Sequence, residues 1–219
     1  MKRVLILAEG QTEERFVKDI LQPHLLVLGI AIQPKIATTK RVKSGPDFKG
    51  GITDFKKVED DLRRLLGDTG ATMVTTLLDF YGFPKDFPGW AAVNAAHPPI
   101  QRVKQLEKAL EDHFANPRFH AYLMLHEYEA MLFAGTNQTA QALNDPRKAS
   151  DVQAIRDGCS GPEKIDDGVN TAPSKRVRML FPGYQKALHG PLVIRRIGLD
   201  QVRASCPHFN EWLTALEAL

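Results

Sequence analysis

VTTLLDFYGFP, residues 74–84, is the stretch of this 219-residue chain that decides its fold. Residues 74–78 are apolar or β-branched, a composition typical of a strand that is covered on both faces. Asp79 follows where the apolar run ends, and Gly82 and Pro84 then interrupt the strand. The stretch therefore predicts a buried strand with a carboxylate at its carboxyl end, the edge of an open α/β sheet where ligands bind.

Two further segments repeat this design. Residues 2–8 form an apolar run that is followed by Glu9, and residues 121–125 form another that is followed, one residue later, by Glu127. The carboxyl ends of neighbouring parallel strands meet at one edge of a sheet. If the three strands are neighbours, we expect these two carboxylates and that of Asp79 to converge. The alternative for each residue is a cap or a solvated turn.

Strand and helix patterns alternate along the chain, which predicts an α/β fold with a mainly parallel sheet flanked by helices. The C-terminal part is predicted to be helical. We expect an α/β domain at residues 1–134 and a mostly helical extension, packed on the same core, at residues 135–219. Helices are predicted at residues 12–28, 54–66, 100–114, 150–156, 174–188 and 199–217, and strands at residues 2–8, 30–37, 74–79 and 118–125, with a further short apolar run at residues 191–197 that is compatible with a strand.

Composition limits the classes of function. A formal net charge of +3 permits nucleic-acid binding without requiring it. Cys159 and Cys206 are the only cysteines and have no metal-ligand spacing, so we expect reduced thiols in a reducing compartment. Glu9 interrupts the first apolar run too early for a signal peptide, and no apolar run is long enough to span a bilayer. We therefore expect a cytoplasmic protein.

The acidic residues have the chemistry of a metal site. Carboxylates within about 4–6 Å repel one another and raise each other's pKa, and a divalent cation removes that penalty. Ligands that are all oxygen suit Mg²⁺, Mn²⁺ or Ca²⁺ rather than zinc. Glu13 lies one helical turn beyond Glu9 and can face the same site, and Glu129 is a weaker addition. Residues 126–130 begin like a zinc-protease motif but lack its second histidine, which excludes zinc proteolysis.

Basic residues supply candidates for contact with phosphate groups. A glycine-rich basic loop covers residues 38–53, and its alternative interpretation is a solvated surface loop. A second group lies at the start of a predicted helix, where a solvated helix start is again the alternative. The candidates are Lys40, Arg41, Lys43, Ser174, Lys175, Arg176 and Lys186.

Five short motifs give the chain a resemblance to a known family. They are EGQTE (9–13), DFYGFP (79–84), HEYEA (126–130), PSKR (173–176) and CPHFNEW (206–212). Together they resemble an uncharacterised bacterial family with a Toprim-like (topoisomerase–primase) domain. The first motif is similar to the Glu-Gly start of that domain, in the variant found in nucleases of the overcoming-lysogenization-defect type. The fold that the resemblance implies is a Toprim-like sheet.

The resemblance implies a Mg²⁺- or Mn²⁺-dependent nuclease acting on DNA or RNA, with an ABC-type ATPase as a partner in phage defence. Metal ions activate a water molecule and stabilise the leaving oxygen in such enzymes. The residues expected to orient the ligands are Tyr81, His126 and Glu129. The expected metal ligands are Glu9, Glu13, Asp79 and Glu127, and the expected catalytic residues are Glu9, Asp79, Glu127 and Lys175.

Tyr81 departs from the Toprim pattern, which has a second aspartate at this position. A phenol is a poor metal ligand at neutral pH. Either Glu127 supplies the missing carboxylate, or the site holds metal weakly and the protein is a catalytically degenerate nucleic-acid-binding or regulatory subunit. Metal-dependent cleavage distinguishes these two readings.

Overall fold

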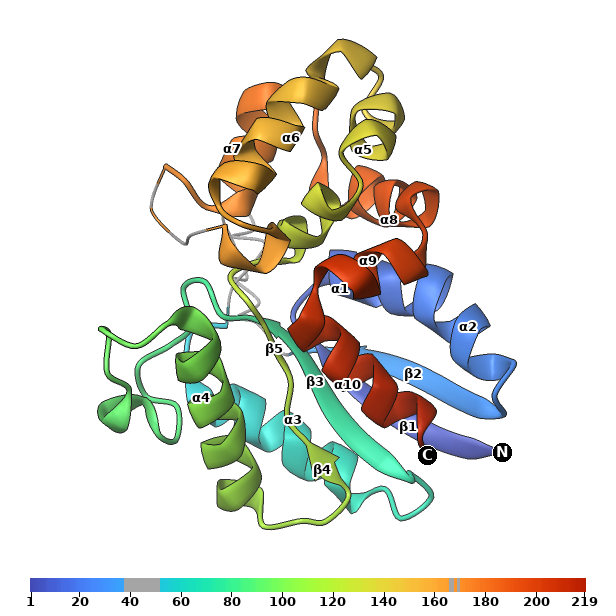
Figure 1. Ribbon diagram of the computed structural model, residues 1–219. Coiled ribbons are helices and arrows are strands. Elements are labelled where there is room, and N and C mark those ends of the chain that lie inside the picture. The colour runs from blue at the N-terminus through green and yellow to red at the C-terminus, as the bar shows by residue number, and fades with distance from the viewer. Residues whose placement is uncertain (38–51, 166–167, 169) are drawn as a thin grey trace, which may run out of the picture.

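A parallel sheet forms the centre of the protein (Figure 1). The computed structural model describes residues 1–37, 52–165, 168 and 170–219. The strand order is β2-β1-β3-β4, and β5 continues beyond β4 along the same side of β3. The strands are β1 (Lys2–Ala8), β2 (Ile30–Ile36), β3 (Met73–Asp79), β4 (Phe119–His120) and β5 (Leu123–Met124).

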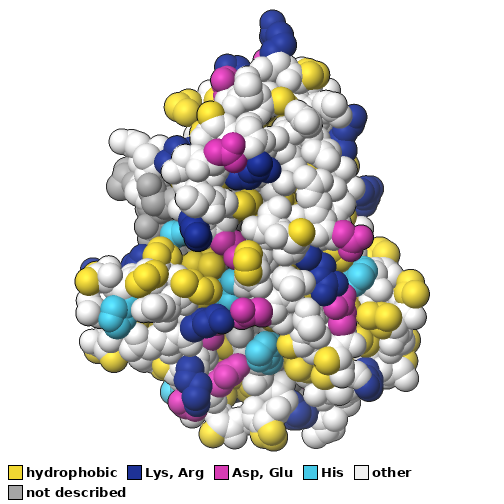
Figure 2. Space-filling view, in the orientation of Figure 1, with side chains coloured by type: hydrophobic (Ala, Val, Ile, Leu, Met, Phe, Trp, Pro, Cys, Tyr) yellow, Lys and Arg dark blue, Asp and Glu magenta, His cyan; other side chains and the backbone are white. Residues whose placement is uncertain are grey.

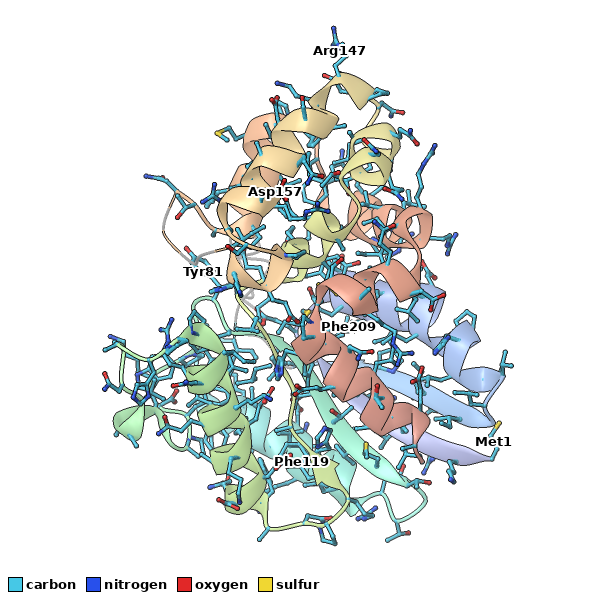
Figure 3. The ribbon with its side chains drawn as sticks, in the orientation of Figure 1. Met1, Tyr81, Phe119, Arg147, Asp157 and Phe209 are labelled. Carbon is cyan, nitrogen blue, oxygen red and sulfur yellow. The ribbon has the colours of Figure 1, made fainter. Side chains whose placement is uncertain are left out.

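Alternate side chains of each strand point to opposite faces of the sheet, and each face is covered by helices. One face packs on α3 (Phe55–Gly67) and α4 (Pro99–Phe114). The other face packs on the N-terminal helices and on α10 (Pro207–Glu217), whose Phe209 is labelled in Figure 3. The N-terminal helical segments are α1 (Gln11–Phe16), a π-helical turn (Val17–Leu21) and α2 (Gln22–Leu26).

The remaining helices lie beyond the carboxyl edge of the sheet, and α5, α6 and α7 lie farthest from it (Figure 1). They are η3 (Tyr128–Ala134, 3₁₀), α5 (Thr136–Ala142), α6 (Ala149–Gly158), α7 (Pro173–Leu180), α8 (Lys186–Ile197) and α9 (Leu199–Ser205), with short 3₁₀ turns at Pro146–Lys148 and Pro162–Lys164. A further 3₁₀ turn, Trp90–Ala92, lies beside α4, whose Gln105 donates to the Ala92 carbonyl. The prediction of an α/β fold with a parallel sheet and a helical C-terminal part is confirmed. The division after residue 134 stays a prediction. No helix in the described part of the chain is long and apolar enough to cross a membrane.

The predicted strand at residues 118–125 is two short strands, because a threonine interrupts the ladder between them. Thr76 donates its hydroxyl to the Tyr122 carbonyl at 2.7 Å and accepts the Tyr122 N–H at 2.8 Å. The side chain of a β3 residue thus satisfies the backbone groups that a regular ladder would pair. Next to it, Thr75 accepts the indole N–H of Trp212 at 2.9 Å, which fixes α10 to β3.

The edge formed by β4 and β5 is covered by two glutamates of α4. Glu107 accepts the Leu123 N–H at 2.8 Å, and Glu111 accepts the Ala121 N–H at 3.1 Å. Glu107 also contacts His208 Nε2 at 2.9 Å. Both carboxylates therefore occupy backbone donors that would otherwise face outward from the sheet.

The prediction of a possible strand at residues 191–197 is wrong, because these residues form the second half of α8. Pro191 has no N–H, so the carbonyl of Ala187, four residues earlier, receives no helical hydrogen bond from it. Arg15 of α1 donates to that carbonyl at 2.9 Å. At Gly190, the residue before the proline, a Cβ would lie 2.8 Å from the Tyr128 ring. Helix α8 is therefore held closely against α1 and η3, with the proline inside it.

Candidate functional site

The three acidic strand ends are brought together by the sheet. β1 and β5 both pair with β3 in parallel, so Glu9 and Glu127 follow strands on either side of Asp79. Glu9 Oε2 accepts the backbone N–H of Asp79 at 2.9 Å. Asp79 Oδ1 in turn accepts the backbone N–H of Tyr128 at 3.0 Å. These two hydrogen bonds therefore fix the ends of β1 and β3 and the start of η3 relative to one another.

Lys186, the first residue of α8, lies at the centre of this edge. Its Nζ is 3.2 Å from Asp79 Oδ2, 3.3 Å from Glu129 Oε2 and 3.5 Å from Glu13 Oε1. The three acidic side chains are at most 9% exposed, whereas the lysine side chain is 30% exposed. Three buried carboxylates from three different elements thus share one ammonium group, and we call Asp79, Glu13, Glu129 and the adjacent Glu9 the acidic cluster.

Burial dominates the electrostatics of the acidic cluster. It raises the pKa of Glu9 from 4.5 to about 8, and the negative charge of Asp79 adds to the increase. Burial likewise raises the pKa of Glu129 to about 7, although Lys186 opposes the increase. The pKa of Glu13 is raised for the same main reason. Burial would lower the pKa of the lysine, but the surrounding carboxylates outweigh it and hold that pKa well above its ordinary value.

Glu127 faces a different partner. Its two carboxylate oxygens accept the backbone N–H of Ser174 at 2.8 Å and the hydroxyl of the same residue at 3.0 Å. Both groups belong to the first turn of α7, so this carboxylate ties α7 to the end of β5. Lys175, the next residue, is exposed, and Arg176 donates to the Thr171 carbonyl at 2.6 Å.

A left-handed backbone turn separates β5 from η3. His126 has a φ of +66° and is fully buried, a conformation that costs energy for a residue with a side chain. Its carbonyl accepts the Tyr81 N–H at 2.7 Å. The turn redirects the chain so that the Tyr128 N–H reaches Asp79. Tyr81 is half-buried and lies where the sheet meets the helical group (Figure 3).

The donor set suits a hard divalent ion, but the arrangement holds an ammonium. Carboxylate oxygens are the ligands that Mg²⁺ and Mn²⁺ prefer. Glu13 Oε1 and Glu129 Oε2 are buried and have no hydrogen-bond partner in the described chain, although each faces Lys186. Among the described residues, no group of three or more His, Cys, Asp or Glu side chains is arranged to hold a metal ion. The oxygen donors of the acidic cluster thus suit a divalent ion in kind, whereas their present arrangement around Lys186 does not hold one.

Two residues lie elsewhere than the sequence predicts. Glu129 is expected beside the metal ligands and Lys186 at a phosphate group, whereas the two side chains contact each other at the centre of the acidic cluster. The Glu-x-Glu spacing of HEYEA was the available signal, because residues two apart in a tight turn can face different neighbours.

Lys40, Arg41 and Lys43 lie outside the described residues. On the face shown in Figure 2, basic and acidic side chains are interspersed rather than collected into one basic surface.

The acidic cluster predicts that stability falls as pH rises. Between pH 4.5 and 8, Glu9 keeps its proton in the folded state after the unfolded chain has lost it. The folded state then binds more protons, so the free energy of unfolding decreases with pH. Without divalent ions we expect a loss of about 1–3 kcal/mol from pH 5 to pH 8, since each pKa unit corresponds to about 1.4 kcal/mol.

Urea denaturation at several pH values measures this dependence. Glu9→Gln should flatten the profile, because its amide does not titrate. Glu14→Gln is the control, because Glu14 lies in the first turn of α1 and pairs with Lys18 outside the cluster. Equal pH slopes for wild type and Glu9→Gln would contradict the prediction.

The fold and site define an α/β protein with an acidic cluster at the carboxyl edge of a parallel sheet. The chain belongs to the family described as Domain of unknown function (DUF4276), which matches residues 8–217. Its structure is similar to the C-terminal region of the OLD protein of Xanthomonas campestris pv. campestris, with 16% sequence identity and a TM-score of 0.37 over 100% of this chain and 99% of that chain. A similarity this low carries no functional argument. No curated protein matches the chain.

Proposed function

We propose that the acidic cluster binds Mg²⁺ or Mn²⁺ and that the protein hydrolyses phosphodiester bonds in DNA or RNA. The observation that carries the proposal is the convergence of three buried carboxylate oxygens on one point, two of them without a hydrogen-bond partner in the described chain. Buried carboxylates are costly unless a cation compensates them. The ammonium group of Lys186 carries a single positive charge, which does not compensate all three carboxylates that face it.

The residues take the following roles in the proposal. Asp79, Glu13 and Glu129 would hold the ion, with Glu9 beside them as a further ligand. A bound divalent ion supplies a metal-activated water and stabilisation of the leaving oxygen. The carboxylate of Glu127 accepts two hydrogen bonds from Ser174, so in this proposal it would anchor α7, and its role as a metal ligand stays a prediction.

Charge on the transferred phosphate needs a cation from the protein as well. Lys175 follows the anchored serine directly and is exposed, so its ammonium is available to a phosphate oxygen. Arg176 stands next in the chain and donates to a backbone carbonyl through Nε. The five motifs support, in addition, a Toprim-type relationship and an ABC-type ATPase partner in phage defence.

A second candidate function rests on Lys186. An ammonium group that already occupies the centre of the cluster can replace a metal permanently. The protein would then be a catalytically degenerate subunit that binds nucleic acid or regulates a partner. In this case Tyr81, in place of an acidic residue, marks the loss of catalysis.

A cleavage assay distinguishes the two. The purified full chain is incubated with labelled duplex DNA, single-stranded DNA and RNA in MnCl₂, MgCl₂ or EDTA. Metal-dependent fragments from at least one substrate, absent in EDTA, are the expected result. Intact substrates in every metal, together with retained binding of nucleic acid in a mobility-shift assay, would support the second candidate and contradict the first.

A further inference from the structure

Lys186 holds the acidic cluster more loosely than a dedicated ion pair would. Charge-assisted hydrogen bonds between ammonium and carboxylate groups are about 2.7–2.9 Å long. The three contacts of Lys186 Nζ measure 3.2, 3.3 and 3.5 Å, and the contact with Asp79 is the one that meets hydrogen-bond geometry. The ammonium therefore lies at the centre of the three oxygens as a counter-ion that donates a hydrogen bond to Asp79 but not to the Glu13 and Glu129 oxygens.

The lysine can leave without disturbing the helix that carries it. It is the first residue of α8, and its side chain is 30% exposed. The helix itself is fixed further along, by Arg15 on the Ala187 carbonyl and by the close approach of Gly190 to Tyr128. Rotation of the lysine side chain toward solvent thus requires no movement of these contacts.

A divalent ion and the ammonium compete for the same oxygens. Ligand oxygens lie about 2.0–2.6 Å from Mg²⁺ or Ca²⁺, so an ion at the centre leaves no room for Nζ. The ion brings two positive charges where the lysine brings one, and it can satisfy the two oxygens that lack a hydrogen-bond partner in the described chain. Exchange of one cation for the other is therefore favoured by charge and opposed by the loss of the ion pairs.

We propose that Lys186 is a resident counter-ion that occupies the divalent-ion site and is displaced when the ion binds. The proposal rests on the proposed function, because it assumes that the acidic cluster takes a divalent ion. It adds that the protein's own lysine sets the ion concentration at which the site fills. The site is thereby kept closed and charge-compensated until enough metal is present.

Calorimetric titration of the full chain with MnCl₂ at pH 8 tests the proposal. Lys186→Met removes the competing charge and should bind Mn²⁺ at least about tenfold more tightly than wild type, which corresponds to one ion-pair contact of about 1.4 kcal/mol. Lys186→Arg retains the charge and should bind no more tightly than wild type. Lys104→Met is the matched control, since Lys104 pairs with Glu211 on the surface, outside the cluster.

Amine labelling gives a second readout that needs no variant. Acetylation of Lys186 in wild type, followed by mass spectrometry, should increase when Mn²⁺ is added, while labelling of Lys104 stays constant. This readout keeps the proposal testable if Lys186→Met does not fold.

The outcomes separate this proposal from the proposed function. Equal or weaker Mn²⁺ binding by Lys186→Met, or labelling that does not increase, would overturn the resident counter-ion and leave the metal site standing. Absence of Mn²⁺ binding in wild type and in both Lys186 variants would overturn both. Metal binding without cleavage would overturn the nuclease and leave the displacement of Lys186 intact.

Discussion

Asp79→Asn should reduce metal-dependent cleavage by at least about 10³-fold. Loss of one electrostatic contact to a transition state typically costs about 10²–10³ in rate, and this substitution also removes a proposed metal ligand. Asp79 is the residue that joins the others, since its oxygens contact both Tyr128 N–H and Lys186 Nζ. Asparagine keeps the shape and one acceptor, so the backbone hydrogen bond to Tyr128 can persist.

Initial cleavage rates at saturating Mn²⁺ measure the effect. Asp112→Asn is the control, because Asp112 is an exposed α4 residue paired with Lys108, outside the cluster. Circular dichroism shows whether the variant is folded. A folded Asp79→Asn protein with more than a tenth of wild-type activity would contradict the proposed function.

Trp212→Ala should lower the free energy of unfolding by about 3–5 kcal/mol, the range for removing a large buried aromatic side chain. The indole is 2% exposed, stacks on Tyr122 with ring centroids 4.6 Å apart, and donates its N–H to Thr75. The substitution thus removes apolar contacts and a buried hydrogen bond at once. It also loosens the attachment of α10 to the central strand.

Urea denaturation provides the measurement. Trp212→Phe keeps an aromatic ring but loses the hydrogen bond, so its stability should lie between those of wild type and Trp212→Ala. Trp90→Ala is the control at a half-buried position in the segment after β3, and a smaller loss is expected there. A loss below 1 kcal/mol for Trp212→Ala would show that α10 contributes little to the core.

The central strand was predictable because the apolar pattern that defines it lies within one short segment of the sequence. Apolar and β-branched residues end at Asp79, and the same pattern at residues 2–8 and 121–125 required parallel neighbours to bury them. The meeting of Glu9 and Asp79 at one sheet edge followed from that arrangement. The interruption at Tyr122 did not, because it depends on the hydroxyl of Thr76, a residue 46 positions earlier in the chain.

The identity of the carboxylates around Lys186 could not be derived from spacing alone. Which of Glu127 and Glu129 faces inward depends on the positive φ of His126 and on the 3₁₀ geometry that follows. Hydrophobic periodicity predicts the direction of a side chain only in a regular strand or α-helix, and residues 126–129 lie in neither. The strand prediction for residues 191–197 is wrong for a related reason. Pro191 leaves the Ala187 carbonyl without its helical donor, and the Arg15 side chain that donates to it instead lies far away in sequence.

The glutamates that cover the β4–β5 edge have a consequence for behaviour in solution. An exposed strand edge is a template on which strands of other molecules can add, and such addition begins many forms of aggregation. Glu107 and Glu111 already hold the N–H groups of Leu123 and Ala121, and they bring negative charge to that edge. Within the described residues, the opposite edge strand, β2, contains Pro34, which has no N–H to offer. The sheet therefore resists growth into fibrils from either side.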